Sequence, residues 1–313
     1  MPVCDQFPRP SVEASALNDQ NDIDKLNNLR AKNLQNPFFS YYNINSLRFK
    51  FDDLKEIISK SLPDVLVFAE TKLDSSFSNA QFFLEEYYEP TRKDKSCVSG
   101  GLIEYIRKGI LRTRLSDFEL TNFESIASEL TINKNKYFLL SFYRTERNEN
   151  KLQNIIKFFQ ELSPILDKAT NKYDDIILMG DINIDLHDKK CVGFKQLNDF
   201  MDIFNLTNLI KDKTCFFRDH ESSIDVILTN KPRKYFNSKS FELGVSDCHK
   251  MIVTNLRAHV SHLSTKTIEY RSMKNFKKED FLKELETHLN DFTYTTTNMA
   301  YDNLNKYFVK CAR

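Results

Sequence analysis

Short apolar runs that end in polar side chains recur along this chain. In the clearest case, four apolar residues at 176–179 are followed by Gly180, Asp181 and Asn183. A continuous apolar run of this length predicts a strand that is covered on both faces. Side chains two positions apart in a strand point the same way, so Asp181 and Asn183 are expected next to each other at its carboxyl end. Taken alone, this pattern is more often a strand that enters a polar turn.

Five further predicted strands repeat the design, and this repetition favours a functional site over a simple turn. They lie at 38–44, 65–69, 137–143, 224–228 and 251–253, and alternation over 126–132 predicts one more strand that is half-exposed. A sandwich of sheets can bring such strand ends together at one edge. The polar residues at or near these ends are Asn43, Asn45, Glu70, Tyr143, Asp225, Asp247 and His249.

Apolar residues at helical spacing predict helices between the strands. An apolar helix face at 54–62 follows Asp52 and Asp53, either of which can cap the helix. Two more amphipathic helices are predicted at 152–166 and 193–205. A strand followed by a helix and a second strand is typical of helices packed on a sheet.

The two ends of the chain differ from its middle. Residues 1–36 are rich in Asn, Asp, Gln and Pro, which predicts a disordered tail with at most a short helix near 23–34. Residues 258–313 are polar, with one helical pattern at 281–289, and are expected to form a linker or an appended helical segment. The remaining residues, 37–257, are predicted to form one α/β domain with a sizeable core.

Composition limits the classes of function. Of 313 residues, 41% are hydrophobic and 28% are charged, which is ordinary for a globular protein. The formal net charge is +1, so any nucleic-acid-binding surface has to be local. Six cysteines without a CxxC pair indicate reduced thiols. We find no signal segment at 1–10 and no run that could span a membrane, so we expect an intracellular protein without a membrane partner.

The polar residues at the strand ends suit the hydrolysis of a phosphodiester. This anion repels hydroxide, so its hydrolysis needs a cation, a base near the water and fixed donors for the developing charge. Glu70 is a hard oxygen ligand of the kind that Mg²⁺ prefers, with amide oxygens and waters as further ligands. Asp181 is the candidate base, and Asn183 is placed to hold the water. His249, kept cationic by Asp225, can donate to a phosphate oxygen.

Most of these residues also have a plainer structural interpretation. Asn43 and Asn45 are in isolation more often turn residues, and Glu70 fits a solvated strand exit. Tyr143 can donate to phosphate or position the water, but a lone tyrosine is more often a core aromatic. Asp225 is harder to dismiss, because a carboxylate inside an apolar strand is costly unless it is paired.

Six short motifs, in this order, resemble those of the endonuclease/exonuclease/phosphatase superfamily. The resemblance is greatest to the abasic-endonuclease-type domain at the head of non-LTR (LINE-type) retrotransposon polyproteins, and it spans residues 37–257. Six motifs in order are specific, whereas any one alone is weak. The motifs are Asn43-Ile44-Asn45-Ser46-Leu47-Arg48, Ala69-Glu70-Thr71-Lys72, Tyr143-Arg144, Gly180-Asp181-Ile182-Asn183, Ser223-Ile224-Asp225 and Ser246-Asp247-Cys248-His249.

This resemblance implies a four-layer αββα sandwich, with two mixed sheets face to face and helices outside. It also implies a nuclease that needs Mg²⁺, for which Mn²⁺ can substitute, and that acts on DNA in the nucleus. The segment 269–276 resembles the connector to a reverse transcriptase in the parent polyprotein, and no polymerase follows here. The expected site residues are Asp181, Asn183, Asp225, His249 and Tyr143 for catalysis, Glu70, Asn43, Asn45 and Asp247 for the metal, and Arg48, Lys72, Arg144 and Arg147 for DNA contact.

Two departures from the family pattern bear on activity. Ala69 stands where the family has a glutamine before the metal-binding glutamate, which removes a partner that would steady Glu70. Cys248 separates Asp247 from His249, whereas the family reads Ser-Asp-His. One inserted residue in a strand turns the next side chain to the opposite face, so either a bulge re-aims His249 or the pairing with Asp225 is lost. We expect the bulge.

Three functions therefore compete. The first is a metal-dependent endonuclease that nicks DNA and leaves a 3′-hydroxyl. The second is a phosphatase or phosphodiesterase that acts on a small or lipid substrate, since one scaffold can host several chemistries. The third is a catalytically degraded remnant or DNA-binding module, which the departures at Ala69 and Cys248 would explain.

Overall fold

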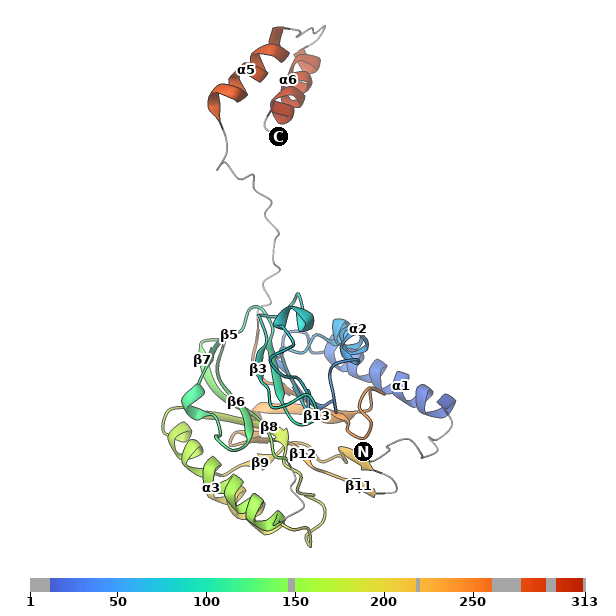
Figure 1. Cartoon of the computed structure of the whole chain (residues 1–313), viewed down its shortest axis with the longest axis vertical. Coiled ribbons are helices and arrows are strands. Elements are labelled where there is room, and N and C mark those ends of the chain that lie inside the picture. The colour runs from blue at the N-terminus through green and yellow to red at the C-terminus, as the bar shows by residue number, and fades with distance from the viewer. Residues whose placement is uncertain (1–11, 146–149, 218–219, 261–276, 291–296, 312–313) are drawn as a thin grey trace. The chain divides into compact units, whose positions relative to one another are not determined.

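The structure is a computed structural model that describes residues 12–145, 150–217, 220–260, 277–290 and 297–311. The chain forms two compact units, Met1–Leu263 and Ser264–Arg313 (Figure 1). The first unit holds all of the strands and the helices α1–α4 of the described chain, and the second holds α5 and α6.

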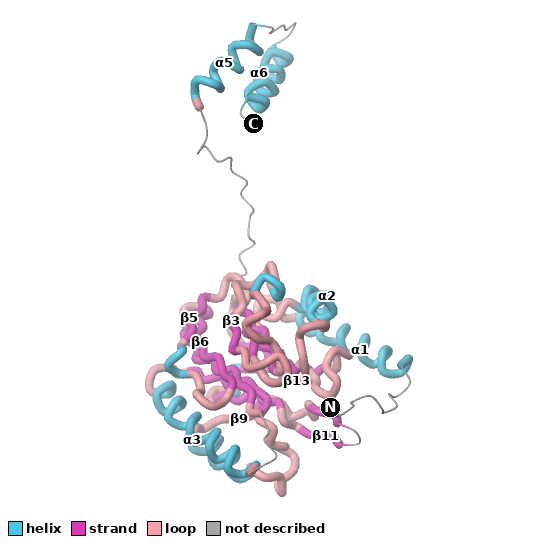
Figure 2. Tube along the Cα trace, viewed as in Figure 1, coloured by secondary structure: helices cyan, strands magenta, loops and turns pink. Residues whose placement is uncertain are grey.

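Two six-stranded sheets form the centre of the first unit (Figure 2). The pairs β1/β2 and β7/β8 are parallel and the remaining pairs are antiparallel, so both sheets are mixed. In the first sheet the order is β13 (Tyr235–Phe241), β14 (Met251–Leu256), β1 (Phe38–Asn43), β2 (Val65–Ala69), β4 (Leu102–Ile106) and β3 (Thr91–Lys93). In the second it is β5 (Leu111–Arg114), β6 (Glu124–Ile132), β7 (Asn135–Tyr143), β8 (Asp175–Asp181), β12 (Asp225–Thr229) and β9 (Thr207–Asn208).

Three apolar clusters divide the unit into four layers. The middle cluster lies between the sheets and joins residues of both, such as Val67 of β2 and Met179 of β8. A second packs α1 (Val12–Ala31) and α2 (Phe51–Ser61) on the outer face of the first sheet, and a third packs α3 (Lys151–Thr170) and α4 (Phe194–Ile203) on the second. Helices therefore lie on both outer sides of the strands, as Figure 1 shows. The predicted αββα sandwich is confirmed.

The N-terminal segment differs from the sequence prediction. Residues 12–31 form the helix α1, which begins earlier than the short helix predicted near 23–34 within a disordered tail. In its second half, Ile23 and Leu29 pack against the apolar cluster on the first sheet, and Leu26 is fully buried there. Arg30 forms an ion pair with Asp64 (3.0 Å), and both side chains are buried. Helical spacing and one ion pair anchor a stretch whose polar composition suggested disorder.

Two smaller expectations also need correction. Neither Asp52 nor Asp53 caps α2, because the helix begins one residue earlier and its N-cap is Lys50, without a side-chain cap. Both aspartates lie in the first turn, where their charge favours the helix dipole. Strand β6 is largely buried and not half-exposed. Its polar Ser128 points inward and donates to the buried Glu104 carboxylate (2.6 Å), so a polar alternation here does not mark a solvent face.

The remaining strands and α-helices of the described chain are two short strands in the first unit and two helices in the second. β10 (Cys215–Phe217) and β11 (His220–Ser222) form a two-stranded ribbon, and Cys215 of β10 bridges to His249 before β14. In the second unit, α5 (Lys278–Asn290) includes the helical pattern predicted at 281–289, and α6 (Thr297–Cys311) follows it. Among the described helices, none is long and apolar enough to cross a membrane. The domain boundaries predicted at 37 and 257 stay predictions.

Candidate active site

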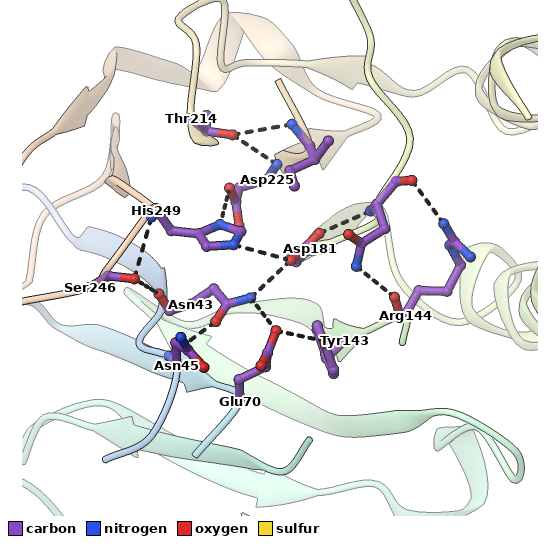
Figure 3. A network of polar contacts seen from close by, with 12 residues as sticks. Asn43, Asn45, Glu70, Tyr143, Arg144, Asp181, Thr214, Asp225, Ser246 and His249 are labelled. Atoms are coloured by element: carbon purple, nitrogen blue, oxygen red, sulfur yellow. Dashed lines mark hydrogen bonds and ion pairs between the residues drawn. The ribbon is translucent and has the colours of Figure 1, made fainter. Parts of the chain in front are cut away.

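The strand register places the predicted polar residues at one edge of the sandwich. In the second sheet, Asp181 at the end of β8 is directly opposite Tyr143 of β7 on one side and Asp225 of β12 on the other. In the first sheet, Asn43 ends β1 beside Ala69, and Glu70 follows as the next residue. The side chains from both sheets meet in one polar network (Figure 3).

Asn43 connects the two sheets. Its amide nitrogen Nδ2 donates to Glu70 Oε1 (3.1 Å) and to Asp181 Oδ2 (2.9 Å), while its Oδ1 accepts the backbone N–H of Asn45 (3.2 Å). Glu70 Oε1 also accepts the hydroxyl of Tyr143 (2.7 Å). Asn43 and Tyr143 therefore steady Glu70 without the glutamine that Ala69 replaces.

His249 lies between two buried aspartates. Its Nδ1 is 3.0 Å from Asp225 Oδ2, and its Nε2 is 4.0 Å from Asp181 Oδ2. Burial alone would lower the pKa of His249, but the negative charge and hydrogen bond of Asp225 raise that pKa well above its usual value. The imidazole is thus held in its cationic form. Thr214 Oγ1 fixes the start of β12 by accepting the N–H of Asp225 (3.1 Å).

The inserted Cys248 does not misdirect His249. Residues 244–248 form bends, and β14 begins only at Met251, so the extra residue lies in the loop between β13 and β14. Ser246 shapes this loop: its hydroxyl donates to the carbonyl of Asn43 (2.8 Å) and accepts the N–H of His249 (3.3 Å). The insertion is absorbed by a loop and not by the predicted bulge within a strand, and the ring still faces Asp225.

Asp181 has an unusual proton affinity. Burial first, and the charge of Asp225 second, raise the pKa of Asp181 from 3.8 to about 7, although His249, Asn43 and the N–H of Asn183 act in the opposite direction. A carboxylate whose pKa lies near neutrality can accept a proton from water and release it again. This is the proton affinity that a general base requires.

Asn183 and Arg144 both form hydrogen bonds to groups at the carboxyl end of β8 and β7, and the proposed water contact of Asn183 stays a prediction. The backbone N–H of Asn183 donates to Asp181 Oδ1 (2.9 Å), and its side chain donates to the carbonyl of Arg144 (2.8 Å). Arg144 is fully buried and its guanidinium donates to the carbonyls of Ile182 (2.5 Å) and Asn183 (2.9 Å). The expected DNA contact by Arg144 is therefore wrong: this residue fixes the turn that carries Asp181.

The basic and acidic groups at the rim form a second set of contacts. The side chain of Asp247 is 67% exposed; it accepts from Asn45 Nδ2 (2.8 Å) and lies 3.6 Å from the ammonium of Lys50. Lys72 donates to Asn45 Oδ1 and lies 3.9 Å from Glu70 Oε2. Asn45 thus contacts both Asp247 and Lys72, and Lys72 in turn lies next to Glu70.

Two further residues were predicted to contact DNA. Arg48 is exposed and stacks on the Phe77 ring at 4.9 Å, and Arg147 lies outside the described residues.

The donor set fits a divalent cation. Asp181 and Asp225 each place one carboxylate oxygen within 4.8 Å of the other and of a ring nitrogen of His249, and the ring itself can bind a metal only after it loses a proton. Asp225 Oδ1 is buried and has no hydrogen-bond partner in the described chain. Glu70 adds a carboxylate that is 21% exposed, and hard divalent cations prefer oxygen ligands. In contrast, Asn43 presents its NH₂ group, not its oxygen, to the acids.

Several rim residues adopt the left-handed backbone conformation. Glu70 has φ 50°, Lys72 φ 52° and Asn183 φ 51°. This region is unfavourable for residues other than glycine and, to a lesser degree, asparagine. At Glu70 and Asn183 the chain leaves a strand and turns sharply, which directs the adjacent carboxylates to the edge of the sandwich. Such strain concentrates where function requires it.

Sequence reasoning missed the buried Tyr41. Its hydroxyl donates to the carbonyl of Phe142 (3.2 Å) and accepts the N–H of Asp181 (2.9 Å), so a residue of β1 supports the end of β8 that carries Asp181. The signal was present, because Tyr41 lies two positions before Asn43 and therefore on the same face of the strand. Without knowledge that this face meets the second sheet, a tyrosine in an aromatic-rich strand reads as core.

Comparison with known proteins agrees with this architecture. The sandwich is similar to an AP endonuclease from Leishmania major (TM-score 0.61, 15% identity, covering 71% of this chain and 88% of that one). It is also similar to the Neisseria 3′ phosphatase NExo, solved as a variant bound to a product DNA hairpin (TM-score 0.58, 15%, 70% and 98%). A third similar structure is the endonuclease domain of TRAS1, a telomere-specific non-LTR retrotransposon (TM-score 0.55, 13%, 70% and 98%).

At these identities the likeness establishes the fold alone. Among curated proteins, no sequence matches this chain. The profile of the Endonuclease/Exonuclease/phosphatase family matches residues 40–247, which is most of the chain and runs from within β1 to beyond the end of β13. The sequence resemblance to this superfamily is thereby confirmed, and the chain belongs to the Endonuclease/Exonuclease/phosphatase family.

Proposed function

We propose that this protein is a divalent-metal-dependent phosphodiester hydrolase that nicks DNA, as an endonuclease of the non-LTR retrotransposon type. Family membership supports hydrolysis of phosphoesters. One similar structure is a 3′ phosphatase bound to a DNA hairpin, and another is the endonuclease domain of the non-LTR retrotransposon TRAS1. The order of motifs along this chain, from Asn43 to His249, is that of such domains.

One observation carries the proposal: an aspartate of near-neutral pKa at the end of β8 and a histidine held cationic in the loop before β14 lie 4.0 Å apart. Hydrolysis of a phosphodiester requires a proton acceptor for the water and a donor for the phosphate oxygen, and these two groups supply both roles. In a purely structural ion pair, the aspartate beside a cationic histidine would be expected to have a lowered pKa. The pKa of Asp181 is instead raised.

In the proposed reaction, Asp181 accepts a proton from the attacking water. Asn43 Nδ2 and the N–H of Asn183 hold its two oxygens (2.9 Å each), so that its remaining lone pairs are directed outward. His249 donates to a non-bridging phosphate oxygen, where negative charge develops, while Asp225 holds the ring in place and balances its charge. Tyr143 positions Glu70 through its hydroxyl.

Glu70 is the first candidate to hold the cation, with Asn45 and Asp247 as further oxygen ligands and Mg²⁺ as the proposed ion. When bound, such a cation neutralises phosphate charge. In the structure, Lys72 lies between Glu70 and Asn45, so this ammonium has to move when a cation binds. Asn43 would join the ligands only with its side-chain amide reversed, because its NH₂ group now faces both carboxylates.

The rim offers a local surface for the DNA backbone. Arg48 is exposed above the ring of Phe77, and the partly exposed Lys50 and Lys72 lie beside the loop that follows β1. Such side chains can contact phosphates and set the register of a duplex without reading its sequence. The near-neutral charge of the whole chain leaves this local group as the proposed source of attraction.

A supercoiled plasmid tests the proposal directly. With Mg²⁺, wild-type protein should convert the plasmid to open circles, and EDTA should abolish this conversion. Asp181→Asn and His249→Gln should each lose it, whereas the exposed controls Asp117→Asn and His220→Gln should retain it. The ends of the nick should be 3′-hydroxyls that a polymerase can extend. Equal, slow nicking by wild type and Asp181→Asn would refute the proposal.

The same experiment separates the two competing functions. A degraded remnant would bind DNA but not cut it, and the intact pairing of His249 with Asp225 argues against this function. A phosphatase or phosphodiesterase for small or lipid substrates would release phosphate from such substrates and leave the plasmid intact. The likeness to a 3′ phosphatase makes a DNA hairpin with a 3′-phosphate the informative additional substrate.

A further inference from the structure

Two thiols lie next to the candidate catalytic histidine. Cys215, the first residue of β10, is directly opposite His249 in an isolated antiparallel bridge. Backbone hydrogen bonds on the two sides of this pair, 2.7 and 2.8 Å long, join the two segments, and the first of them ends on the carbonyl of Cys248. The sulfurs of Cys215 and Cys248 and a ring nitrogen of His249 lie within 4.8 Å of one another.

We infer that Cys215, Cys248 and His249 form a binding site for a soft divalent cation of the Zn²⁺ class. Two thiolates and an imidazole are the ligands that such a cation prefers, and water can fill the fourth tetrahedral position. Bond lengths of about 2.3 Å to sulfur and about 2.0 Å to nitrogen place ligand atoms roughly 3.5–4 Å apart. Small side-chain rotations are therefore enough to close the present cluster around one ion.

The surroundings of the cluster are those of a metal site. Asp225 holds the ring of His249 through a 3.0 Å contact, and a carboxylate behind a ligating histidine fixes its orientation and strengthens its binding. Cys215 is buried, which excludes competing water, whereas Cys248 is partly exposed and leaves a path for the ion. Magnesium would not compete, because hard cations bind thiolates poorly.

Occupation of this site would switch the protein off, a consequence that depends on the proposed nuclease function. Each ring nitrogen of His249 already has a role: Nδ1 faces Asp225 and Nε2 faces Asp181. Whichever nitrogen binds the ion, the ring can no longer both pair with Asp225 and donate to phosphate. Two sulfur–metal bonds and one nitrogen–metal bond form, and the two thiol protons and any proton on that nitrogen pass to the solvent.

Cobalt(II) gives a readout that does not depend on activity. The full chain, reduced with a phosphine and kept without oxygen, is titrated with Co²⁺ and followed by its absorption. Wild type should show a thiolate-to-cobalt charge-transfer band that saturates at one equivalent and is removed by Zn²⁺. Cys97→Ser, which alters an exposed thiol elsewhere, should give the same band. Cys248→Ser and Cys215→Ser should lose it and weaken Zn²⁺ binding by at least about 10–100-fold.

Two results would overturn the inference. One is a wild type whose thiols are free by titration but which gives no charge-transfer band; the other is an unchanged band in Cys248→Ser. If Cys215→Ser unfolds, as circular dichroism would show, the partly exposed Cys248→Ala decides. In the nicking assay, micromolar Zn²⁺ should inhibit wild type but not Cys248→Ser, each relative to its own rate. A cobalt band without any nicking would refute the proposed function and leave the metal site standing.

Discussion

A carboxylate flanks each end of strand β2, and the two carboxylates differ in the number of positive charges around them. Asp64, just before the strand, is fully buried, lies 3.0 Å from Arg30 and 3.6 Å from Arg107, and accepts the N–H of Phe38 (2.8 Å). Two cations and a backbone donor surround one negative charge. The charge at this end is fully compensated, and it ties α1 to the first sheet.

At the other end of the same strand, acids outnumber cations. Glu70, directly after β2, joins Asp181 and Asp225, and against these three stand the imidazole of His249 and the ammonium of Lys72. Burial first, and the charge of Asp225 second, raise the pKa of Asp181, so the imbalance contributes to this shift.

The difference shows how one fold separates stability from chemistry. A buried acid that is surrounded by cations contributes to the fold as long as none of its partners is removed. A buried acid that is left short of positive charge costs stability, but it remains able to exchange a proton or bind a cation. Substitutions at the two ends of β2 should therefore affect different measurements.

The largest expected effect is on catalysis. Asp181→Asn removes the proposed proton acceptor but keeps the size of the side chain, and should lower the nicking rate about 10²–10⁴-fold. Its melting temperature in EDTA near pH 7 should be equal to or higher than the wild-type value, because the neutral amide replaces a buried acid. A variant that loses activity only because it unfolds would show instead that this end of β2 is structural as well.

The next effect is on stability at the opposite end. Asp64→Ala leaves Arg30 buried without its carboxylate and should lower the free energy of unfolding by about 3–5 kcal/mol. The nicking rate per folded molecule should be unchanged, because Asp64 lies at the end of β2 away from the candidate site. Asp53→Ala, at an exposed acid of α2, is the control and should change stability by less than about 0.5 kcal/mol. Denaturant titration with a parallel nicking assay measures both.

A smaller effect should appear in the pH dependence of stability. Burial and then Asp225 raise the pKa of Asp181 from 3.8 to about 7, so the folded protein keeps this proton to a higher pH than the unfolded chain does. Its contribution to stability therefore falls as pH rises from 4 to 7. Relative to Asp181→Asn in EDTA, wild type should lose about 2–4 kcal/mol over this range. A difference that stays constant would mean that Asp181 is ionised throughout.

The smallest effect concerns the DNA surface. Arg48→Ala should weaken binding of a plasmid or duplex a few-fold and reduce the slope of log affinity against log salt by about 0.9, as expected for one lost phosphate contact. Arg233→Ala removes an exposed arginine of η3 (Pro232–Lys234), beyond the end of β12 that lies away from Asp225, and should leave the slope unchanged. Equal slopes for all three proteins would remove Arg48 from the proposed surface.

Much of the fold was predictable because its cause is local. Apolar runs such as 176–179 become central strands wherever both faces are covered, and the helical spacing at 152–166 needed no tertiary information. The helix α1 was not predictable in this way, since it depends on the distant Asp64 to compensate Arg30. The burial of Ser128 likewise depends on Glu104 across the sandwich.

Residues of the candidate site were likewise predictable where the cause is local and not where it is long-range. Asp225 demanded a partner on energetic grounds alone, and His249 is that partner. Arg144 was misjudged because a basic residue in a loop reads as exposed, whereas its partners here are backbone carbonyls that no sequence pattern marks. The position of His249 after the inserted Cys248 depended on a loop anchored by Ser246, which belongs to long-range geometry.

The amide of Asn43 has a consequence that reaches beyond its two hydrogen bonds. Because one NH₂ group serves both Glu70 and Asp181, events at these two carboxylates are thermodynamically linked. Any cation that draws Glu70 toward itself loosens or reverses this amide and so alters how tightly Asp181 retains its proton. By reciprocity, the protonation state of Asp181 must change the affinity for the cation by the same factor. Cation binding at Glu70 and proton binding at Asp181 are therefore coupled equilibria.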